Sequence, residues 1–243
     1  AEVSLNRKKL ADHHCGYTAF TVDLTDGLRF GEDNLLEVRV DSRENQNVPP
    51  FGFVIDYMTF GGIYRDVYLE VKNKEHIADA FLTAKDVDVL AGKAVLESQI
   101  SLSVDDFTDG KYELSQKLDG EEIVHAAISN KAFTVVSDLM DVDLWDVDSP
   151  TLYHMTTELI KDGQVIDSTD TRFGFRKIDF KADGFYLNDR KVKLRGLNRH
   201  QSYPYVGYAM PESMQRYDAD ILKNELGCNA VRTSHYPQSH YFI

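Results

Sequence analysis

The chain has 243 residues, of which 42% are hydrophobic, 28% are charged and 11% are aromatic. This composition is ordinary for a soluble globular protein and excludes a disordered chain, a collagen-like repeat and a disulfide scaffold. The formal net charge of −13, from 40 acidic against 27 basic residues, would repel a phosphate backbone on average. Nucleic acid is therefore not an expected partner.

Cysteine content and hydropathy bear on the cellular compartment. Cys15 and Cys228 are the only cysteines, and one distant pair without a framework favours reduced thiols and a cytoplasmic protein. No stretch approaches about 18 consecutive apolar residues, so we expect no membrane span. Residues 1–6 contain no initiator Met, basic region or apolar region. We therefore expect no signal peptide in this chain and a natural N-terminus that lies upstream.

Residues 1–72 are predicted to form strands separated by turns. Three segments have β character: 17–24, 35–40 and 63–71. In the last of these, apolar residues on one face alternate with polar and aromatic residues on the other. These strands are pieces of an antiparallel sandwich but are too few to close one. The polar residues 72–75 mark a domain junction.

Residues 73–177 are predicted to form an immunoglobulin-like β-sandwich. In one segment the apolar residues occupy even positions and polar residues lie between them: Ala94, Leu96, Ile100, Leu102 and Val104. Residues 153–161 have a similar apolar face. Asp-Gly pairs at 109–110, 119–120 and 162–163 suit hairpin turns. About 100 residues with some seven strands is the size of such a sandwich, and the lack of a Cys–Trp–Cys pattern excludes the antibody type.

After Asp179 the pattern becomes that of an α/β protein. A short strand at 192–196 and a second at 229–233 flank a helix, in which Pro211 stands at a first-turn position and which Gly227 ends. The helix has an apolar stripe formed by Met214, Tyr217, Ile221, Leu222 and Leu226. A crossover of this length predicts parallel strands. Because two parallel strands cannot cover their own faces, we expect the beginning of a larger α/β domain.

Polar clusters follow both strands of this last unit, at 198–201 and 232–237. Loops at the carboxyl ends of parallel barrel strands converge over one mouth, where active sites are built. The clusters contain donors and acceptors that suit sugar hydroxyls: Asn198, His200, Arg232 and His235. The spacing alone fits salt-bridged or surface groups equally well.

Three sets of motifs, in chain order, resemble glycoside hydrolase family 2, which includes β-galactosidases. Residues 60–67 (FGGIYRDV) resemble the end of that family's sugar-binding jelly roll. The end of its immunoglobulin-like middle domain is matched by Leu144-Trp145, residues 150–153 (PTLY) and residues 173–176 (FGFR). The start of its catalytic barrel is matched by residues 193–201 (KLRGLNRHQ) and 228–237 (CNAVRTSHYP). The resemblance covers almost the whole chain.

This resemblance implies a mainly β fold in three parts. Residues 1–72 would be the C-terminal part of a jelly roll, residues 73–177 the immunoglobulin-like sandwich, and residues 178–243 the first βαβ unit of an incomplete (β/α)₈ barrel. The whole enzyme would remove terminal β-linked galactose by a retaining mechanism that uses two glutamates. A β-glucuronidase or β-mannosidase of the same family is the alternative, and a non-catalytic carbohydrate-binding or spacer module is the alternative of another class.

The resemblance places both glutamates beyond Ile243, so we expect no hydrolysis by this chain alone. The Asn224-Glu225 pair is rejected as the acid/base because it lies inside the predicted helix. A carbohydrate is the expected partner, and the whole enzyme is expected to form a homo-oligomer.

The family's binding residues are carried over position by position. His200 and His235 match histidines that hydrogen-bond sugar hydroxyls, whereas Asn198 and Arg232 match neighbours that orient the site and support the nucleophile's carboxylate. Asp56 matches an acid that touches the sugar and a sodium ion. The resemblance thus implies sodium or magnesium in the whole enzyme and no cofactor required by this chain. Gln201 departs from the Glu of the best-known β-galactosidases, which leaves the exact substrate open.

Overall fold

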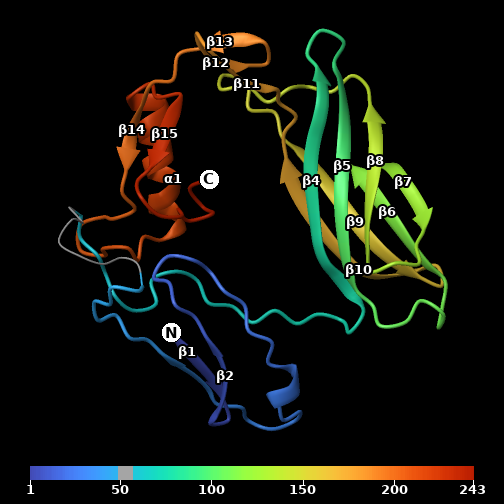
Figure 1. Ribbon diagram of the computed structural model, residues 1–243, viewed down its shortest axis with the longest axis vertical. Helices are drawn as coiled ribbons and strands as arrows, with labels where there is room; N and C mark the ends of the chain where they lie inside the picture. The colour runs from blue at the N-terminus through green and yellow to red at the C-terminus, as the bar shows by residue number, and fades with distance from the viewer. Residues whose placement is uncertain (49–56) are drawn as a thin grey trace. The chain divides into compact units, whose positions relative to one another are not determined.

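The structure, a computed structural model, describes residues 1–48 and 57–243. The chain divides into two compact units, and Figure 1 shows their elements coloured from blue to red along the sequence. One unit combines Ala1–Tyr68 with Arg195–Ile243, and the other is Leu69–Leu194. The fold is mainly β, as predicted, and the described residues contain part of a barrel but no closed one.

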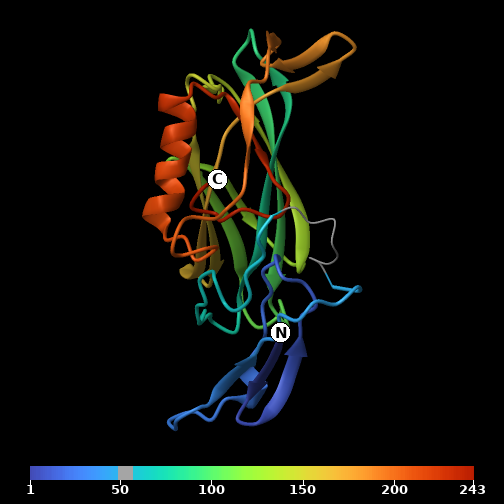
Figure 2. The ribbon, with the colours of Figure 1, turned by 90° about the vertical axis from the view of Figure 1, so that its left-hand side faces the viewer.

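The unit Leu69–Leu194 contains a sandwich of two antiparallel sheets (Figures 1 and 2). Its seven strands are β4 (His76–Asp88), β5 (Lys93–Ser103), β6 (Tyr112–Leu118), β7 (Glu121–Ala127), β8 (Ala132–Leu139), β9 (Tyr153–Lys161) and β10 (Gln164–Phe173). One sheet has the order β4-β5-β8 and the other the order β10-β9-β6-β7. This arrangement confirms the predicted immunoglobulin-like sandwich.

The core of the sandwich lies between the two sheets. The even-numbered apolar residues of β5 and the residue just after it are at most 5% exposed: Ala94, Leu96, Ile100, Leu102 and Val104. Met155 and Leu159 of β9 are fully buried opposite them, in two adjoining clusters. Burial of each large apolar side chain contributes about 1.5–3 kcal/mol. The alternation in the sequence therefore identified the packed face.

Two of the three predicted Asp-Gly hairpins are confirmed. Asp119-Gly120 joins β6 to β7, and Asp162-Gly163 joins β9 to β10. Asp109-Gly110 is not a hairpin, because the preceding β5 and the following β6 belong to different sheets. The loop that contains this pair crosses from one sheet to the other.

A small antiparallel sheet follows the sandwich within the same unit. It consists of β11 (Ile178–Lys181), β12 (Gly184–Leu187) and β13 (Arg190–Val192) in that order. The predicted strand at 192–196 is wrong in its bounds, because β13 ends at Val192 and the next strand begins at Gly196. The domain boundaries predicted at residues 72 and 177 remain a prediction.

The other unit begins with a three-stranded antiparallel sheet in the order β2-β1-β3. Its strands are β1 (Glu2–Leu5), β2 (Lys8–Asp12) and β3 (Leu36–Arg39), with a 3₁₀ turn, η1 (Thr25–Gly27), between β2 and β3. Val3 and Leu5 of β1 are its buried apolar residues.

Two other predicted strands of this region are wrong. Residues 17–24 and 63–71 are irregular, with no ladder of hydrogen bonds to a neighbouring strand among the described residues. The alternating side chains of the second segment are largely solvent-exposed, Val67 and Leu69 at 69% each and Val71 at 87%. A β-like pattern forms a strand only where a partner supplies the hydrogen bonds.

The predicted βαβ unit is confirmed at the end of the chain. β14 (Gly196–Arg199) pairs in parallel with β15 (Ala230–Thr233). Between them lies α1 (Glu212–Asp220), which continues as one π-helical turn, η2 (Ile221–Glu225). Pro211 is the N-cap of α1, one position before the first helical residue, and Gly227 adopts a left-handed φ of +63°.

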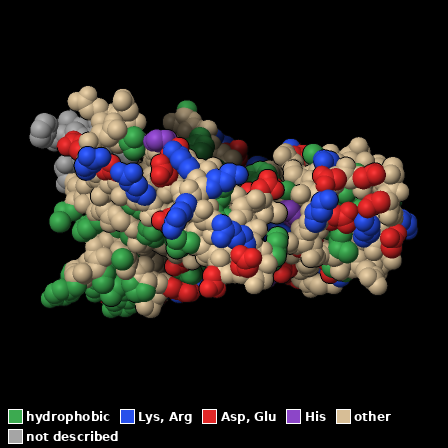
Figure 3. All heavy atoms as spheres, turned by 90° about the horizontal axis from the view of Figure 1, so that it is seen from below, with side chains coloured by type: hydrophobic (Ala, Val, Ile, Leu, Met, Phe, Trp, Pro, Cys, Tyr) green, Lys and Arg blue, Asp and Glu red, His purple; other side chains and the backbone are tan. Residues whose placement is uncertain are grey.

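The surface carries both charged and apolar side chains. Figure 3 shows acidic and basic side chains intermixed on the visible face, with apolar side chains gathered in places. The most exposed apolar residues before the sandwich are Phe30, Met58, Val67, Tyr68, Leu69 and Val71. No helix among the described residues is long and apolar enough to cross a membrane.

Candidate functional site

The carboxyl ends of β14 and β15 bring the predicted site residues side by side. In the register of this parallel pair, Asn198 is the partner of Arg232, and both side chains are exposed. Gly196 allows the strands to approach this closely, because a Cβ at that position would lie 2.0 Å from the carbonyl oxygen of Ala230. A glycine is therefore required at the start of β14.

His200 and His235 follow the two strands and form an edge-to-face pair. Their ring centroids are 5.5 Å apart, with an interplanar angle of 77°. His235 is exposed, whereas His200 is half-buried, and its Nδ1 atom is buried without a hydrogen-bond partner among the described residues. An unpaired buried polar atom is costly, so it marks a place where a ligand group or a water molecule could bind.

The ring of Tyr57 packs against both histidines. Its centroid lies 4.8 Å from that of His200 and 6.0 Å from that of His235. Tyr57 belongs to the segment before the sandwich, so two distant parts of the sequence meet here within one compact unit. Sequence reasoning missed Tyr57, because nothing in its local pattern indicates a partner more than a hundred residues away.

A cluster of tyrosines packs behind the histidines. The ring of Tyr236 stacks on that of Tyr17 at 4.7 Å and 10°, and Tyr208 packs against Tyr236 at 5.3 Å. The Tyr208 hydroxyl donates a hydrogen bond to the carbonyl oxygen of Met58 at 2.8 Å. Burial raises the pKa of Tyr208 and of Tyr17 well above the ordinary value.

Arg199 points away from the histidines and towards α1. The side chain is 5% exposed, and its guanidinium donates to Asp218 Oδ2 at 2.8 and 3.0 Å, to Gln215 Oε1 at 2.7 Å and to Gln238 Oε1. Its guanidinium carbon also lies 3.8 Å from the centroid of the Phe242 ring. The salt-bridge interpretation of the strand-end cluster therefore holds for Arg199. Burial lowers the pKa of its guanidinium, an effect that the Asp218 carboxylate opposes.

Successive side chains along β14 alternate between exposure at the candidate site and burial against α1. Asn198 is exposed beside Arg232, whereas Arg199 is buried against the helix. This alternation was the signal in the sequence that could have separated the two residues, since neighbouring side chains of a strand point to opposite faces.

The metal prediction cannot be placed on the described residues. Asp56, the predicted sugar and metal ligand, lies outside residues 1–48 and 57–243. Within those ranges, no group of three or more His, Cys, Asp or Glu side chains is arranged to hold a metal ion. The predicted ion remains a prediction, and no chemistry is assigned to it.

The carboxyl ends of β14 and β15 and the residues after them supply hydrogen-bond donors and acceptors. Segments 198–201 and 232–237 contain imidazole, amide, guanidinium and hydroxyl groups but no carboxylate. Retaining hydrolysis of a glycoside needs two carboxyl groups about 5–5.5 Å apart. The groups present here can donate to and accept from several hydroxyls of one sugar, and Arg232 could also orient a carboxylate.

Comparison with known proteins identifies similar sequences over both units. The model of glycosyl hydrolases family 2 matches residues 75–176, and the model of that family's TIM barrel domain matches residues 178–243. The β-galactosidase of Thermoanaerobacter pseudethanolicus is 41% identical over 253 residues, which cover 100% of this chain and 33% of that protein. The β-galactosidase of Rhizobium meliloti is 39% identical over 94% of this chain and 31% of its own length.

Proteins named as β-glucuronidases are similar as well. That of Bacteroides fragilis is 31% identical over 99% of this chain and 36% of its own length. Among solved structures, a β-glucuronidase of Bacteroides uniformis has a TM-score of 0.89 at 29% identity, over 99% of this chain and 30% of that chain. The chain thus spans about a third of the length of the curated relatives that it matches.

Proposed function

The chain belongs to glycosyl hydrolases family 2, and from that membership we propose that it is part of a retaining glycosidase that removes terminal β-linked galactose. The choice of sugar is supported by the degree of similarity. Three relatives named as β-galactosidases share 41%, 41% and 39% of residues with this chain and three others 30–32%, against 33% and 31% for two named as β-glucuronidases.

The pair formed by His200 and His235 is the observation that carries this proposal. Each ring follows one of two adjacent parallel strands, where barrel enzymes bind substrate, and the Nδ1 of His200 is buried and unpaired among the described residues. A neutral imidazole offers one donor and one acceptor, so two rings 5.5 Å apart can each bind a different hydroxyl of one sugar.

Asn198 and Arg232 are proposed to bind beside the histidines. The Asn198 amide supplies both a donor and an acceptor, and the Arg232 guanidinium is proposed to support the nucleophile's carboxylate. We assign sugar binding to this chain and the bond-breaking carboxylates to another segment of the enzyme. The chain alone is therefore expected to bind a sugar weakly and to hydrolyse none.

A β-glucuronidase is the second candidate, since several solved structures with a similar fold carry that name. A glucuronide differs from a galactoside by a carboxylate, which an exposed arginine such as Arg232 could bind. A glucuronide therefore requires a cationic partner in the site, which a galactoside does not, and the binding of the two sugars can be compared directly.

The test is a titration of the chain with methyl β-D-galactoside, followed through the histidine ring protons by NMR. We expect the His200 and His235 resonances to shift with a millimolar dissociation constant, while those of His76 and His125 in the sandwich stay fixed as internal controls. Methyl β-D-glucuronide and methyl β-D-mannoside should cause smaller shifts.

Larger shifts with the glucuronide would reassign the enzyme to the second candidate. The absence of any sugar-dependent shift at His200 and His235, or hydrolysis of nitrophenyl β-D-galactoside by the purified chain, would contradict the assigned roles. His235→Ala should abolish the shift at His200, whereas the control His76→Ala should leave it unchanged.

A further inference from the structure

The residue after His200 is buried and forms hydrogen bonds through its side chain and its main chain. Gln201 is 1% exposed. Its Oε1 atom accepts a hydrogen bond from the main-chain N–H of Ser239 at 2.6 Å. Its own main-chain N–H donates to the hydroxyl of Tyr236 at 3.0 Å. Gln201 therefore binds the loop that follows β15 at two separate points.

The loop that Gln201 binds carries His235. Tyr236 comes directly after this histidine, is 5% exposed and is stacked on Tyr17. Ser239 is 8% exposed. One hydrogen bond therefore joins the residues that come directly after the two histidines. The second hydrogen bond, from the Ser239 N–H to Gln201 Oε1, holds the same loop four residues after His235.

Arg65 adds a third connection from the segment before the sandwich. Its guanidinium donates to the carbonyl oxygen of Pro237, and its Nη2 lies 3.4 Å from Gln201 Oε1. The amide oxygen of Gln201 thus faces two donors, one from the loop after β15 and one from the motif at residues 60–67. A negatively charged acceptor at this place would also suit both donors.

We propose that Gln201 is a positioning residue, whose buried amide oxygen holds the loop of His235 against the end of β14 and so fixes the spacing of the His200 and His235 rings. The sugar-binding role of the two histidines rests on the proposed function, but the spacing itself does not. Gln201 touches neither ring in this role. It acts through Ser239, Tyr236 and Arg65.

The test compares two substitutions that keep the volume of the side chain nearly constant. Gln201→Met removes the acceptor and leaves the buried N–H of Ser239 unpaired, whereas Gln201→Glu keeps an acceptor for Ser239 and Arg65. The matched control is Gln215→Met, since Gln215 is also 1% exposed and lies in the same unit but binds Arg199 of β14.

The first readout is the nuclear Overhauser effect between the His200 and His235 rings in the sugar-free protein. We expect it to be lost in Gln201→Met and retained in the wild type, in Gln201→Glu and in Gln215→Met. The second readout is the affinity for methyl β-D-galactoside, expected to fall about tenfold in Gln201→Met and to be restored in Gln201→Glu.

The two proposals fail in different ways. If the nuclear Overhauser effect between the rings is lost in Gln201→Met and kept in Gln201→Glu but no sugar binds, the positioning role stands and the proposed function fails. If the effect persists in Gln201→Met, or is lost equally in Gln201→Glu or Gln215→Met, the positioning role is overturned. Should Gln201→Met not fold, Gln201→Asn keeps a polar amide but withdraws its oxygen from the Ser239 N–H by the length of one methylene and should weaken the effect, and an unchanged effect would overturn the proposal.

Discussion

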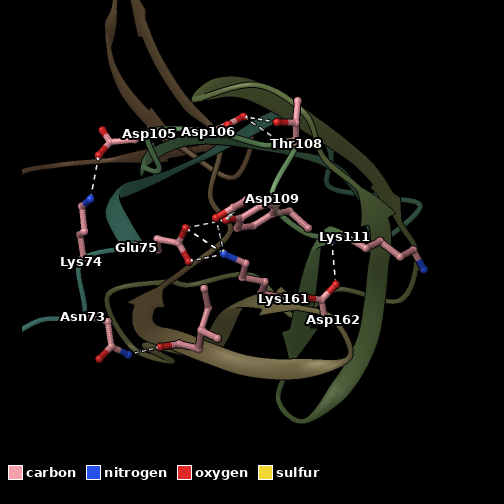
Figure 4. A network of polar contacts seen from close by, with 12 residues as sticks. Asn73, Lys74, Glu75, Asp105, Asp106, Thr108, Asp109, Lys111, Lys161 and Asp162 are labelled. Atoms are coloured by element: carbon pink, nitrogen blue, oxygen red, sulfur yellow. Dashed lines mark hydrogen bonds and ion pairs between the residues drawn. The ribbon is translucent and has the colours of Figure 1, made fainter.

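At the residue scale, Tyr112 is the centre of a charged network inside the sandwich. The side chain is 2% exposed, and its hydroxyl oxygen lies 2.5 Å from Glu75 Oε1 and 2.8 Å from Asp109 Oδ1. Lys161 Nζ lies between the same two carboxylates, 3.1 Å from both oxygens of Glu75 and 3.0 Å from Asp109 Oδ2 (Figure 4). The network joins the start of β4, the loop between the sheets and the end of β9.

The ionisation of this network predicts alkaline destabilisation. Burial and the neighbouring Glu75 carboxylate raise the pKa of Tyr112 from 10 to about 12, and hydrogen bonds to Tyr112 and Asp109 raise the pKa of Lys161. The folded state therefore holds protons that the unfolded chain releases. The stability that depends on them is fully present below pH 10 and is lost as the pH rises through about 12.

We expect the free energy of unfolding, measured by urea denaturation, to fall between pH 10 and about 12 in the wild type. Tyr112→Phe should make this fall smaller and should lower stability at neutral pH by about 1 kcal/mol, the usual worth of one hydrogen bond. The control Tyr217→Phe changes an exposed tyrosine of α1 and should alter neither. An unchanged alkaline fall in Tyr112→Phe would refute the assignment.

At the scale of elements, the hairpins show what a turn sequence can and cannot specify. Asp162 and Gly163 have φ values of 50° and 79°, and Asp119 and Gly120 have values of 48° and 87°. Positive φ at both central residues is the type I′ geometry that matches the twist of paired strands. The third Asp-Gly pair, at 109–110, has no such role because its flanking strands lie in different sheets.

Gly163 offers a direct measure of the turn's conformational cost. A Cβ at this position would meet no atom within 4 Å, so only the backbone conformation opposes a side chain. We expect Gly163→Ala to destabilise the sandwich by about 1–2 kcal/mol. Gly163→Asn should cost clearly less, because asparagine tolerates a left-handed φ. Thermal unfolding followed by circular dichroism measures both, and equal losses would count against this account.

At the scale of the whole molecule, the two compact units differ in how well their strands are buried. Leu102 of the sandwich is 5% exposed, and its N–H donates to the carbonyl oxygen of Lys131 at 2.7 Å. In the parallel pair of the other unit, Leu197 is 51% and Val231 is 37% exposed. The sandwich therefore has the larger share of the apolar burial that stabilises a strand.

Hydrogen exchange should reveal this difference directly. We expect the amide of Leu102 to exchange at least about a hundredfold more slowly than that of Val231, after correction for intrinsic rates. The amide of Leu114, which is fully buried in the second sheet, should behave like Leu102. Equal protection at Val231 and Leu102 in dilute solution would show that the parallel pair is as stable as the sandwich.

Local patterns in the sequence determined much of this fold. The alternation at 94–104 identified the buried face of β5, the Asp-Gly pairs identified two type I′ turns, and Gly227 marked the end of the helical segment. These features depend on residues close together in the chain, whose conformational preferences and hydrophobic period are written in a few positions. The site positions Asn198, His200, Arg232 and His235 also came from sequence, and their sugar-binding role remains a prediction.

Only the tertiary structure decided where hydrogen bonds find partners. The segments 17–24 and 63–71 have the composition of strands but pair with no strand among the described residues. Arg199 and Gln201 alternate with Asn198 and His200 in one cluster, yet they are buried against groups distant in the sequence. A local pattern determines on which face of a strand a side chain lies. Its hydrogen-bond partner depends on contacts between residues distant in the sequence, which form only when the chain folds.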